Sequence, residues 1–275
     1  MTNAHWPDSV AFIGGGNMAR SLIGGMIGKG YDAQRIFVAD PYEPTRAALA
    51  ADFNVNVYEG APDAARNATT WMLAVKPQVM DEVTGSLQSL TDALKPLVIS
   101  IAAGIPIARL RDGLGEHAAI VRTMPNTPAL IGLGATGLYA GSDVSDTRRS
   151  QAQALMEAAG LVAWIDDESL MDSVTALSGS GPAYVFLLAE AMADAAVAQG
   201  MPRSTAVALA NQTLTGAAQM LVTSDVDAAT LRQRVTSPNG TTQAAIESFE
   251  RDGLRAIVQR ALDAARDRGV ELAKG

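Results

Sequence analysis

The chain has 275 residues, a formal net charge of -8 and no cysteine. This length allows a large core and predicts two domains. The acidic balance argues against nucleic acid or an anionic membrane as the main partner. Without cysteine there are no disulfides, thiolate metal sites or thiol catalysis, and we expect no metal. The first residues lack a signal-peptide pattern, and no uninterrupted apolar run reaches membrane-spanning length, so we expect a cytoplasmic protein.

The first 166 residues alternate short apolar runs with helical patterns. Apolar runs of this kind suit buried parallel strands. Strands are expected at residues 10–14, 36–39, 70–75, 97–101, 120–123, 135–139 and 161–165. Helices are expected between the early strands, for example at 18–28, 44–51 and 79–90. This alternation predicts βαβ units and a doubly wound α/β Rossmann sheet over residues 1–166.

A glycine-rich turn follows the first strand and opens a helix. Gly14 permits the tight turn, Gly16 lets the backbone approach a pyrophosphate, and Ala19 stands where a third glycine usually allows close helix–strand packing. The strand before the turn, the helix after it and Asp40 about twenty residues on complete a dinucleotide fingerprint. We therefore expect a nicotinamide dinucleotide to contact Gly14, Gly15, Gly16, Asn17 and Met18.

Asp40, at the end of the second strand, bears on the choice of cofactor. Its carboxylate would accept hydrogen bonds from the adenosine ribose and repel a 2′-phosphate. Glu43 adds to that repulsion, whereas Arg46 would counter it. The alternative is that Asp40 is a plain turn residue. On these residues alone the choice between NADP(H) and NAD(H) stays open.

Loops after the later strands are expected to line the ligand crevice, because ligands of doubly wound sheets bind at the carboxyl ends of the strands. One of these loops carries a lysine that either pairs with a ligand or lies on the surface. The next has small side chains that leave room for a flat ring. The cofactor contacts expected in these two loops are Ala74, Val75, Lys76, Pro77, Ala102, Ala103 and Gly104. Two prolines within residues 124–128 indicate a rigid loop after the following strand.

From residue 167 to 275 the chain is predicted to be all α-helical. Ala, Leu, Met, Val and Gln recur at helical spacing, with breaks at 179–182, 200–202 and 237–240. Pro182 suits the first turn of a long helix over residues 183–199. That helix is apolar on most of its circumference. This indicates either burial inside the domain or a homodimer interface, the interpretation we favour.

Residues 237–242 form a turn rich in Pro and Gly that brings the hydroxyls of Thr241 and Thr242 to a helix start. First-turn amides lack intrahelical partners and the helix dipole favours an anion, so this geometry suits a carboxylate. The alternative is an ordinary helix cap. Together with the dinucleotide fingerprint, the turn predicts an enzyme that brings a small carboxylated substrate to a nicotinamide.

From Val10 to the C-terminus the chain resembles the Δ1-pyrroline-5-carboxylate reductase family of proline biosynthesis, in the strings FIGGGNMA, LAVKPQ, ISIAAGI, RTMPNTP, LSGSGPAY and VTSPNGTTQAAI. The resemblance implies a Rossmann domain followed by a helical dimerisation domain, and NAD(P)H-dependent reduction of the cyclic imine to L-proline. It places the substrate carboxylate at Gly240, Thr241 and Thr242, with the Thr242 hydroxyl near the imine nitrogen as the catalytic group. We also expect Met124 and Asn126 to contact the substrate.

The chain departs from the family pattern at two positions on the adenosine side. Asp40-Pro41-Tyr42 stands where many members have a small or amide residue followed by a basic one. Ala61 stands where members often have Asn. Both departures concern adenosine contacts and cofactor preference rather than the reaction.

The scarcity of His and Lys independently favours imine reduction. Oxidation of an alcohol needs a base, commonly His or Lys, yet between Lys95 and Lys274 the chain offers only His117. An imine protonated from solvent accepts hydride without an enzymic base, so a hydroxyl need only orient the nitrogen or relay its proton. The competing interpretations are a hydroxyacid or 6-phosphogluconate-type dehydrogenase and a catalytically silent nucleotide-binding protein.

Overall fold

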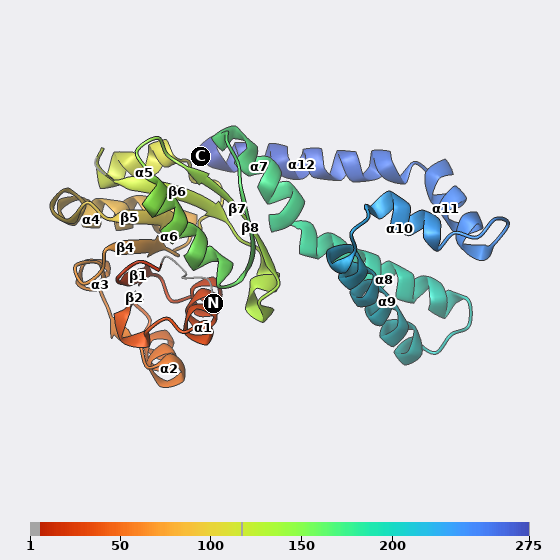
Figure 1. The fold of residues 1–275 in the computed structure, drawn as a ribbon, viewed down its shortest axis with the longest axis horizontal. Coiled ribbons are helices and arrows are strands. Elements are labelled where there is room, and N and C mark those ends of the chain that lie inside the picture. The colour runs from red at the N-terminus through yellow and green to blue at the C-terminus, as the bar shows by residue number, and fades with distance from the viewer. Residues whose placement is uncertain (1–5, 117, 275) are drawn as a thin grey trace. The chain divides into compact units, whose positions relative to one another are not determined.

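A computed structural model of the chain describes residues 6–116 and 118–274, so His5 and His117 lie outside it. The chain forms two compact units (Figure 1). The first runs to Ser180 and also takes the end of the chain from Ala265 onward. The second is Gly181–Ala264.

The first unit contains an eight-stranded sheet in the order β3-β2-β1-β4-β5-β6-β7-β8. Its strands are Val10–Ile13, Ile36–Ala39, Asn56–Tyr58, Thr70–Leu73, Leu97–Ser100, Ala119–Met124, Gly134–Ala140 and Gly160–Trp164, from β1 to β8. All neighbours pair in parallel except β6 and β7, which are antiparallel. The predicted α/β class is confirmed. The short, half-buried β3 is a strand that the sequence patterns did not predict.

Successive residues of the inner strands point to opposite faces of the sheet and enter two apolar cores. In β1, Val10 and Phe12 lie in one core, and Ala11 and Ile13 lie in the other. The first core is covered by α1 (Asn17–Gly28), α2 (Glu43–Phe53) and α6 (Asp146–Glu157), and the second by α3 (Ala61–Ala65), α4 (Met80–Leu94) and α5 (Ile107–Leu114). Because the inner strands β1, β2, β4 and β5 are buried on both faces, their sequences are mostly apolar.

After β8 the chain stays packed on the first unit. The 3-10 turn η4 (Glu168–Leu170) leads to α7 (Met171–Val174) and a π-helix, η5 (Thr175–Gly179). A Cβ on Gly137 of β7 would lie 2.6 Å from the Val174 side chain, so α7 approaches the sheet closely. These contacts keep residues up to Ser180 in the first compact unit. The domain boundary expected between residues 166 and 167 stays a prediction.

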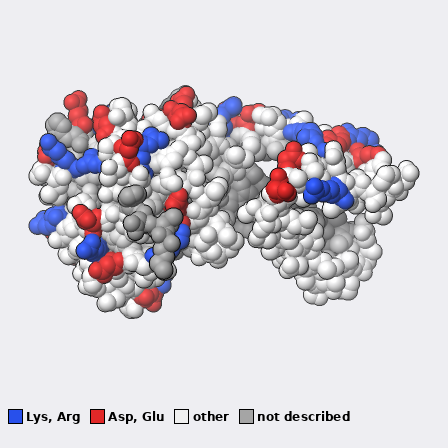
Figure 2. All heavy atoms as spheres, in the orientation of Figure 1, with Lys and Arg blue, Asp and Glu red and all other residues white. Residues whose placement is uncertain are grey.

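The second unit is helical, as predicted. It contains α8 (Gly181–Ala198), α9 (Arg203–Thr223), α10 (Ala228–Arg234), α11 (Thr241–Arg251) and the first part of α12 (Leu254–Lys274). Helices α8 and α9 pack through small residues, with Ala193, Ala206 and Ala210 buried between them. Figure 2 shows few charged side chains over these two helices.

Much of the apolar surface of α8 is exposed rather than buried within its own unit. Phe186 is 66% exposed and Leu187 is 65% exposed. Within the described part of the chain, the stretch Glu168–Ala198 is long and apolar enough to cross a membrane by length and composition alone, and 6% of its apolar window is buried. Such a surface calls for a partner outside the unit.

Candidate active site

The glycine-rich turn lies where the strand order of the sheet reverses, between β1 and β4. Gly14 has a φ of +103°, and a Cβ there would lie 2.6 Å from the carbonyl oxygen of Ala74. At Gly16, by contrast, an added Cβ would meet no atom within 4 Å. Gly16 is the N-cap of α1 and receives no side-chain cap. The turn therefore opens onto a free helix N-terminus, which is a favourable place for a pyrophosphate.

Asp40 is held beside this turn by two backbone amides. Its Oδ2 accepts a hydrogen bond from the Gly15 N–H at 2.8 Å, and its Oδ1 accepts one from the Tyr42 N–H at 2.9 Å. The guanidinium of Arg46 donates to the Asp40 carbonyl oxygen at 2.7 Å. Asp40 is therefore a structured turn residue whose carboxylate is fixed next to the glycine turn, and Arg46 is bound at the same corner.

A crevice of about 320 Å³ lies at the carboxyl ends of the central strands. Its lining residues are Pro77, Gln78, Ala103, Gly104, Ile105, Arg109, Asp172, Thr175, Gly269 and Leu272. Arg109 forms a bidentate ion pair with Asp81, with both contacts at 2.9 Å, and this pairing lowers the pKa of the Asp81 carboxyl. The volume is in the range of small-ligand sites.

The cofactor residues expected from the sequence gather along this edge of the sheet. Asn17 and Met18 open α1, and Ala74 and Val75 follow β4 directly. Lys76 is exposed and forms no hydrogen bond or ion pair with any described residue. Of these predicted cofactor residues, Pro77, Ala103 and Gly104 line the crevice, and Ala102 is buried beside them.

Met124 and Asn126, expected to touch the substrate, both contact the π-helix. The Asn126 side chain donates from Nδ2 to the Ser178 carbonyl at 3.0 Å and accepts from the Ala135 N–H at 2.9 Å. Asn126 is 8% exposed. A Cβ on Gly179 would lie 2.6 Å from the Met124 methyl carbon. Both side chains thus fix the path of the π-helix, and a direct substrate contact stays a prediction.

In the second unit, the first turn of α11 has no side-chain cap, and carboxylate binding there stays a prediction. The helix starts at Thr241, its N-cap is Gly240 with extended backbone, and no side chain caps it. Its first backbone bond runs from the Ala244 N–H to the Gly240 carbonyl at 3.2 Å. The hydroxyls of Thr241 and Thr242 are exposed and have no partner among the described residues. No side-chain hydroxyl of the described residues caps this helix start.

Sequence reasoning missed Gln243, which shapes this turn. Its Oε1 accepts a hydrogen bond from the Asn239 N–H at 2.8 Å, and its Nε2 donates to Glu247 at 2.6 Å. Asn239 has a φ of +60°, in the left-handed region that asparagine tolerates. A long polar side chain at the third helical position, reaching back before the N-cap, is the signal that was available.

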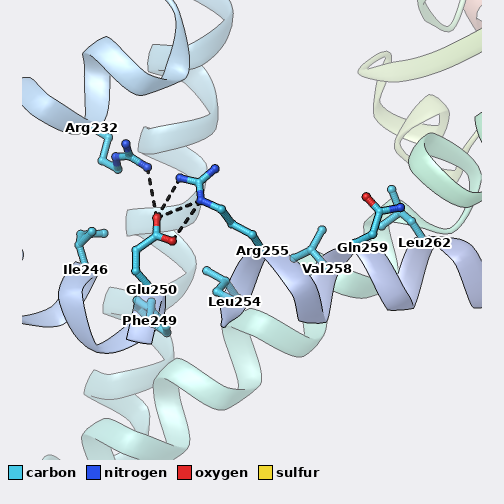
Figure 3. Close-up of a pocket in the computed structure, with 9 residues that line it drawn as sticks. All are labelled: Arg232, Ile246, Phe249, Glu250, Leu254, Arg255, Val258, Gln259 and Leu262. Atoms are coloured by element: carbon cyan, nitrogen blue, oxygen red, sulfur yellow. Dashed lines mark hydrogen bonds and ion pairs between the residues drawn. The ribbon is translucent and has the colours of Figure 1, made fainter. Parts of the chain in front are cut away.

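A second cavity, of about 470 Å³, lies within the second unit (Figure 3). Arg232 and Arg255 both converge on the Glu250 carboxylate, at 3.9 and 2.9 Å. The Arg255 hydrogen bond lowers the pKa of Glu250. The other lining residues are mostly apolar: Ile246, Phe249, Leu254, Val258, Gln259 and Leu262. With its one carboxylate already paired, this cavity offers packing surface rather than reactive groups.

Comparison with known proteins identifies both halves of the chain. Residues 168–272 match the family described as pyrroline-5-carboxylate reductase dimerisation, and residues 9–104 match NADP oxidoreductase, coenzyme F420-dependent. The pyrroline-5-carboxylate reductase of Pseudomonas aeruginosa is 51% identical over 267 residues, which cover 96% of this chain and 97% of that protein. The chain belongs to the pyrroline-5-carboxylate reductase family. The Vibrio alginolyticus member is 43% identical over 96% of this chain and 97% of its own.

Solved structures agree with this assignment. A pyrroline-5-carboxylate reductase from Coxiella burnetii has a TM-score of 0.95 and 40% identity, covering 98% of this chain and 100% of that one. The Plasmodium falciparum pyrroline carboxylate reductase, solved with NADP bound, has a TM-score of 0.83 and 28% identity over 96% and 98% of the two chains. The family resemblance and the two-part Rossmann and dimerisation architecture are confirmed, and so is the predicted function at the level of the family: a nicotinamide-dependent oxidoreductase that reduces pyrroline-5-carboxylate.

Proposed function

We propose that this chain reduces pyrroline-5-carboxylate to L-proline with its glycine turn and crevice holding NAD(P)H and the start of α11 holding the substrate carboxylate. The observation that supports this most strongly is the uncapped first turn of α11. Its amides and the Thr241 and Thr242 hydroxyls stand free in a chain whose other half carries an open dinucleotide turn. A free helix start is a ready anion site.

The residues of the first unit fit a dinucleotide. The open space at Gly16 admits a pyrophosphate against the α1 N-terminus, and Gly14 keeps the backbone turn tight. The crevice beyond it, lined by Ala103 and Gly104, has room for the nicotinamide ring. When bound there, the cofactor supplies the hydride. The protein's part is to orient the ring and exclude other reactions.

The residues of the second unit fit the substrate. The amides at the start of α11 would bind the carboxylate, and the helix dipole adds to the attraction. The Thr242 hydroxyl, exposed and unpartnered among the described residues, would hold the imine nitrogen or relay its proton. An iminium needs no enzymic base, which is consistent with the scarcity of His and Lys.

We further propose that the chain acts as a cytoplasmic homo-oligomer built from dimers, with no membrane or nucleic-acid partner. The exposed apolar residues of α8 lie inside the matched dimerisation region, so a second subunit accounts for them better than a bilayer does. The apolar cavity of the second unit offers further packing surface for that subunit.

An assay of cofactor oxidation tests the proposal. The purified chain is mixed with NADPH or NADH and, in parallel, with pyrroline-5-carboxylate, with a small 2-keto acid, or with no substrate. We expect oxidation with pyrroline-5-carboxylate and accumulation of proline. Turnover with the keto acid alone would favour a hydroxyacid dehydrogenase. Cofactor binding with no turnover on either compound would favour a silent nucleotide-binding protein.

A further inference from the structure

Arg122 of β6 is a buried cation behind the crevice. It is 5% exposed and lies in a strand whose preceding residues are apolar and buried. A buried charge is costly unless it is paired and hydrogen-bonded. The partners that Arg122 has are therefore informative about its role.

Two carboxylates from the segment after β8 meet this guanidinium. Nη1 of Arg122 lies 3.1 Å from Oε1 of Glu168, and Nη2 lies 3.9 Å from Oδ1 of Asp172. Their side chains are 27% and 17% exposed. Glu168 begins η4 and Asp172 is in α7, so Arg122 ties both elements to the sheet.

The same Glu168 oxygen also binds the start of α5, which follows the loop that carries the predicted nicotinamide contacts. Its Oε1 accepts a hydrogen bond from the Ile107 N–H at 2.8 Å. Ile107 is the first residue of α5, directly after residues 102–106. One carboxylate oxygen therefore connects the start of α5, just after the Ala103–Gly104 loop, to Arg122.

Asp172 lies at the crevice itself. It lines the crevice together with Thr175 of the π-helix. The α12 backbone packs against it, because a Cβ on Gly269 would lie 3.1 Å from its Oδ1. Arg122 thus contacts, from behind, the residues that fix two separate parts of the crevice lining.

We propose that Arg122 is a positioning residue for the nicotinamide half of the cofactor site, acting through Glu168 and Asp172. This inference rests on the proposed function, in which the crevice holds the nicotinamide. A buried ion pair contributes little net stability compared with apolar residues of the same volume. Its role here is to set the spacing between the Ala103–Gly104 loop and α7.

Calorimetric titration with two probes separates positioning from general structure. NADH carries the nicotinamide, and ADP-ribose lacks only that ring. For Arg122→Met we expect NADH to bind about tenfold more weakly while the Kd for ADP-ribose stays within about twofold. Arg122→Lys keeps the charge and should restore part of the NADH affinity. Arg111→Met, which removes the ion pair between partly buried Arg111 of α5 and Asp143 after β7, is the matched control and should leave both affinities unchanged.

A second variant covers the case in which Arg122→Met does not fold, because removing one partner leaves a buried charge unpaired. The double change Arg122→Met with Glu168→Leu replaces the pair by apolar side chains. Its melting temperature should be close to that of the wild type. Its affinity for NADH should still fall, whereas its affinity for ADP-ribose should not. Equal weakening of both probes, or no weakening of either, would overturn the positioning role. If the wild-type protein reduces pyrroline-5-carboxylate, the proposed function stands under either of these two results. If the wild-type protein binds NADH no more tightly than ADP-ribose, the premise that the crevice holds the nicotinamide fails. The proposed role of Arg122 then fails with it.

Discussion

The Gly15 amide donates a hydrogen bond to Oδ2 of Asp40 at 2.8 Å and so joins the dinucleotide turn to the end of β2. This contact fixes a negative charge beside the place where an adenosine ribose would lie. A carboxylate at this position accepts hydrogen bonds from a ribose 2′-hydroxyl and repels a 2′-phosphate. The nearby cation, Arg46, is bound to the Asp40 carbonyl oxygen.

We predict that Asp40→Ala raises the ratio of kcat/KM for NADPH to that for NADH by about tenfold or more, since removing a like charge lowers the cost of placing a phosphate there. Asp40→Asn removes the charge but keeps one acceptor oxygen, and it should move the ratio in the same direction. Asp52→Ala, on α2, is the control. An unchanged ratio in both Asp40 variants would show that the carboxylate does not face the ribose.

Thr242→Val should reduce kcat on the order of a hundredfold, by analogy with deletion of one preorganised hydrogen-bond donor. Stability should change by less than about 0.5 kcal/mol, because Gly240 is the N-cap and the exposed Thr242 hydroxyl caps no amide. The changes in kcat and in stability are checked by steady-state kinetics and melting temperature on one preparation. Ser248→Ala, on the same helix, is the control. A variant that melts early but turns over normally would make Thr242 a structural residue.

Gln243→Leu should raise KM for pyrroline-5-carboxylate about tenfold with a smaller effect on kcat, since a loosened turn misplaces the anion site. The physical reason is the loss of the Asn239 N–H to Gln243 Oε1 bond. Steady-state kinetics at saturating NADPH measure the split between the two constants. Gln233→Leu on α10 is the matched control, and its KM and kcat should equal those of the wild type. If KM does not rise, the turn keeps its shape without Gln243.

Much of the fold is readable from the sequence for a physical reason. Strands covered on both faces are mostly apolar, and the glycine turn after β1 has few conformational alternatives. The exception is β3, whose residues Asn56, Val57 and Tyr58 are only partly buried and give no clear pattern. The close approach of Val174 to Gly137 of β7, which keeps α7 with the first unit, is a tertiary contact that local periodicity does not encode.

The backbone features of the candidate site could be predicted from the sequence, but several of its side-chain contacts could not. The free α11 start follows from Gly240 and the threonines that come after it. For Asn126, the sequence shows a polar residue between two prolines but not that the Ser178 carbonyl lies opposite it. The same holds for Arg122, whose carboxylate partners come from a segment far along the chain. Long-range pairings of this kind require the fold.

The α8 surface predicts that assembly is needed for activity. Leu187→Glu places a charge in the apolar surface and should convert the oligomer to monomer at micromolar concentration, with loss of turnover. Light scattering and the cofactor-oxidation assay on the same sample measure both. Glu190→Gln on the same helix is the control. A Leu187→Glu monomer with full activity would refute the need for a second subunit.

The most direct measurement follows the hydride itself. The central claim is that this chain transfers hydride from the nicotinamide to the C=N carbon of pyrroline-5-carboxylate. The chain is incubated with NADH deuterated at the transferable position and with unlabelled pyrroline-5-carboxylate, and the proline formed is examined by mass spectrometry. We predict a single deuterium on the ring carbon that was double-bonded to nitrogen. Oxidation of the cofactor with unlabelled proline, or with no proline at all, would contradict the account.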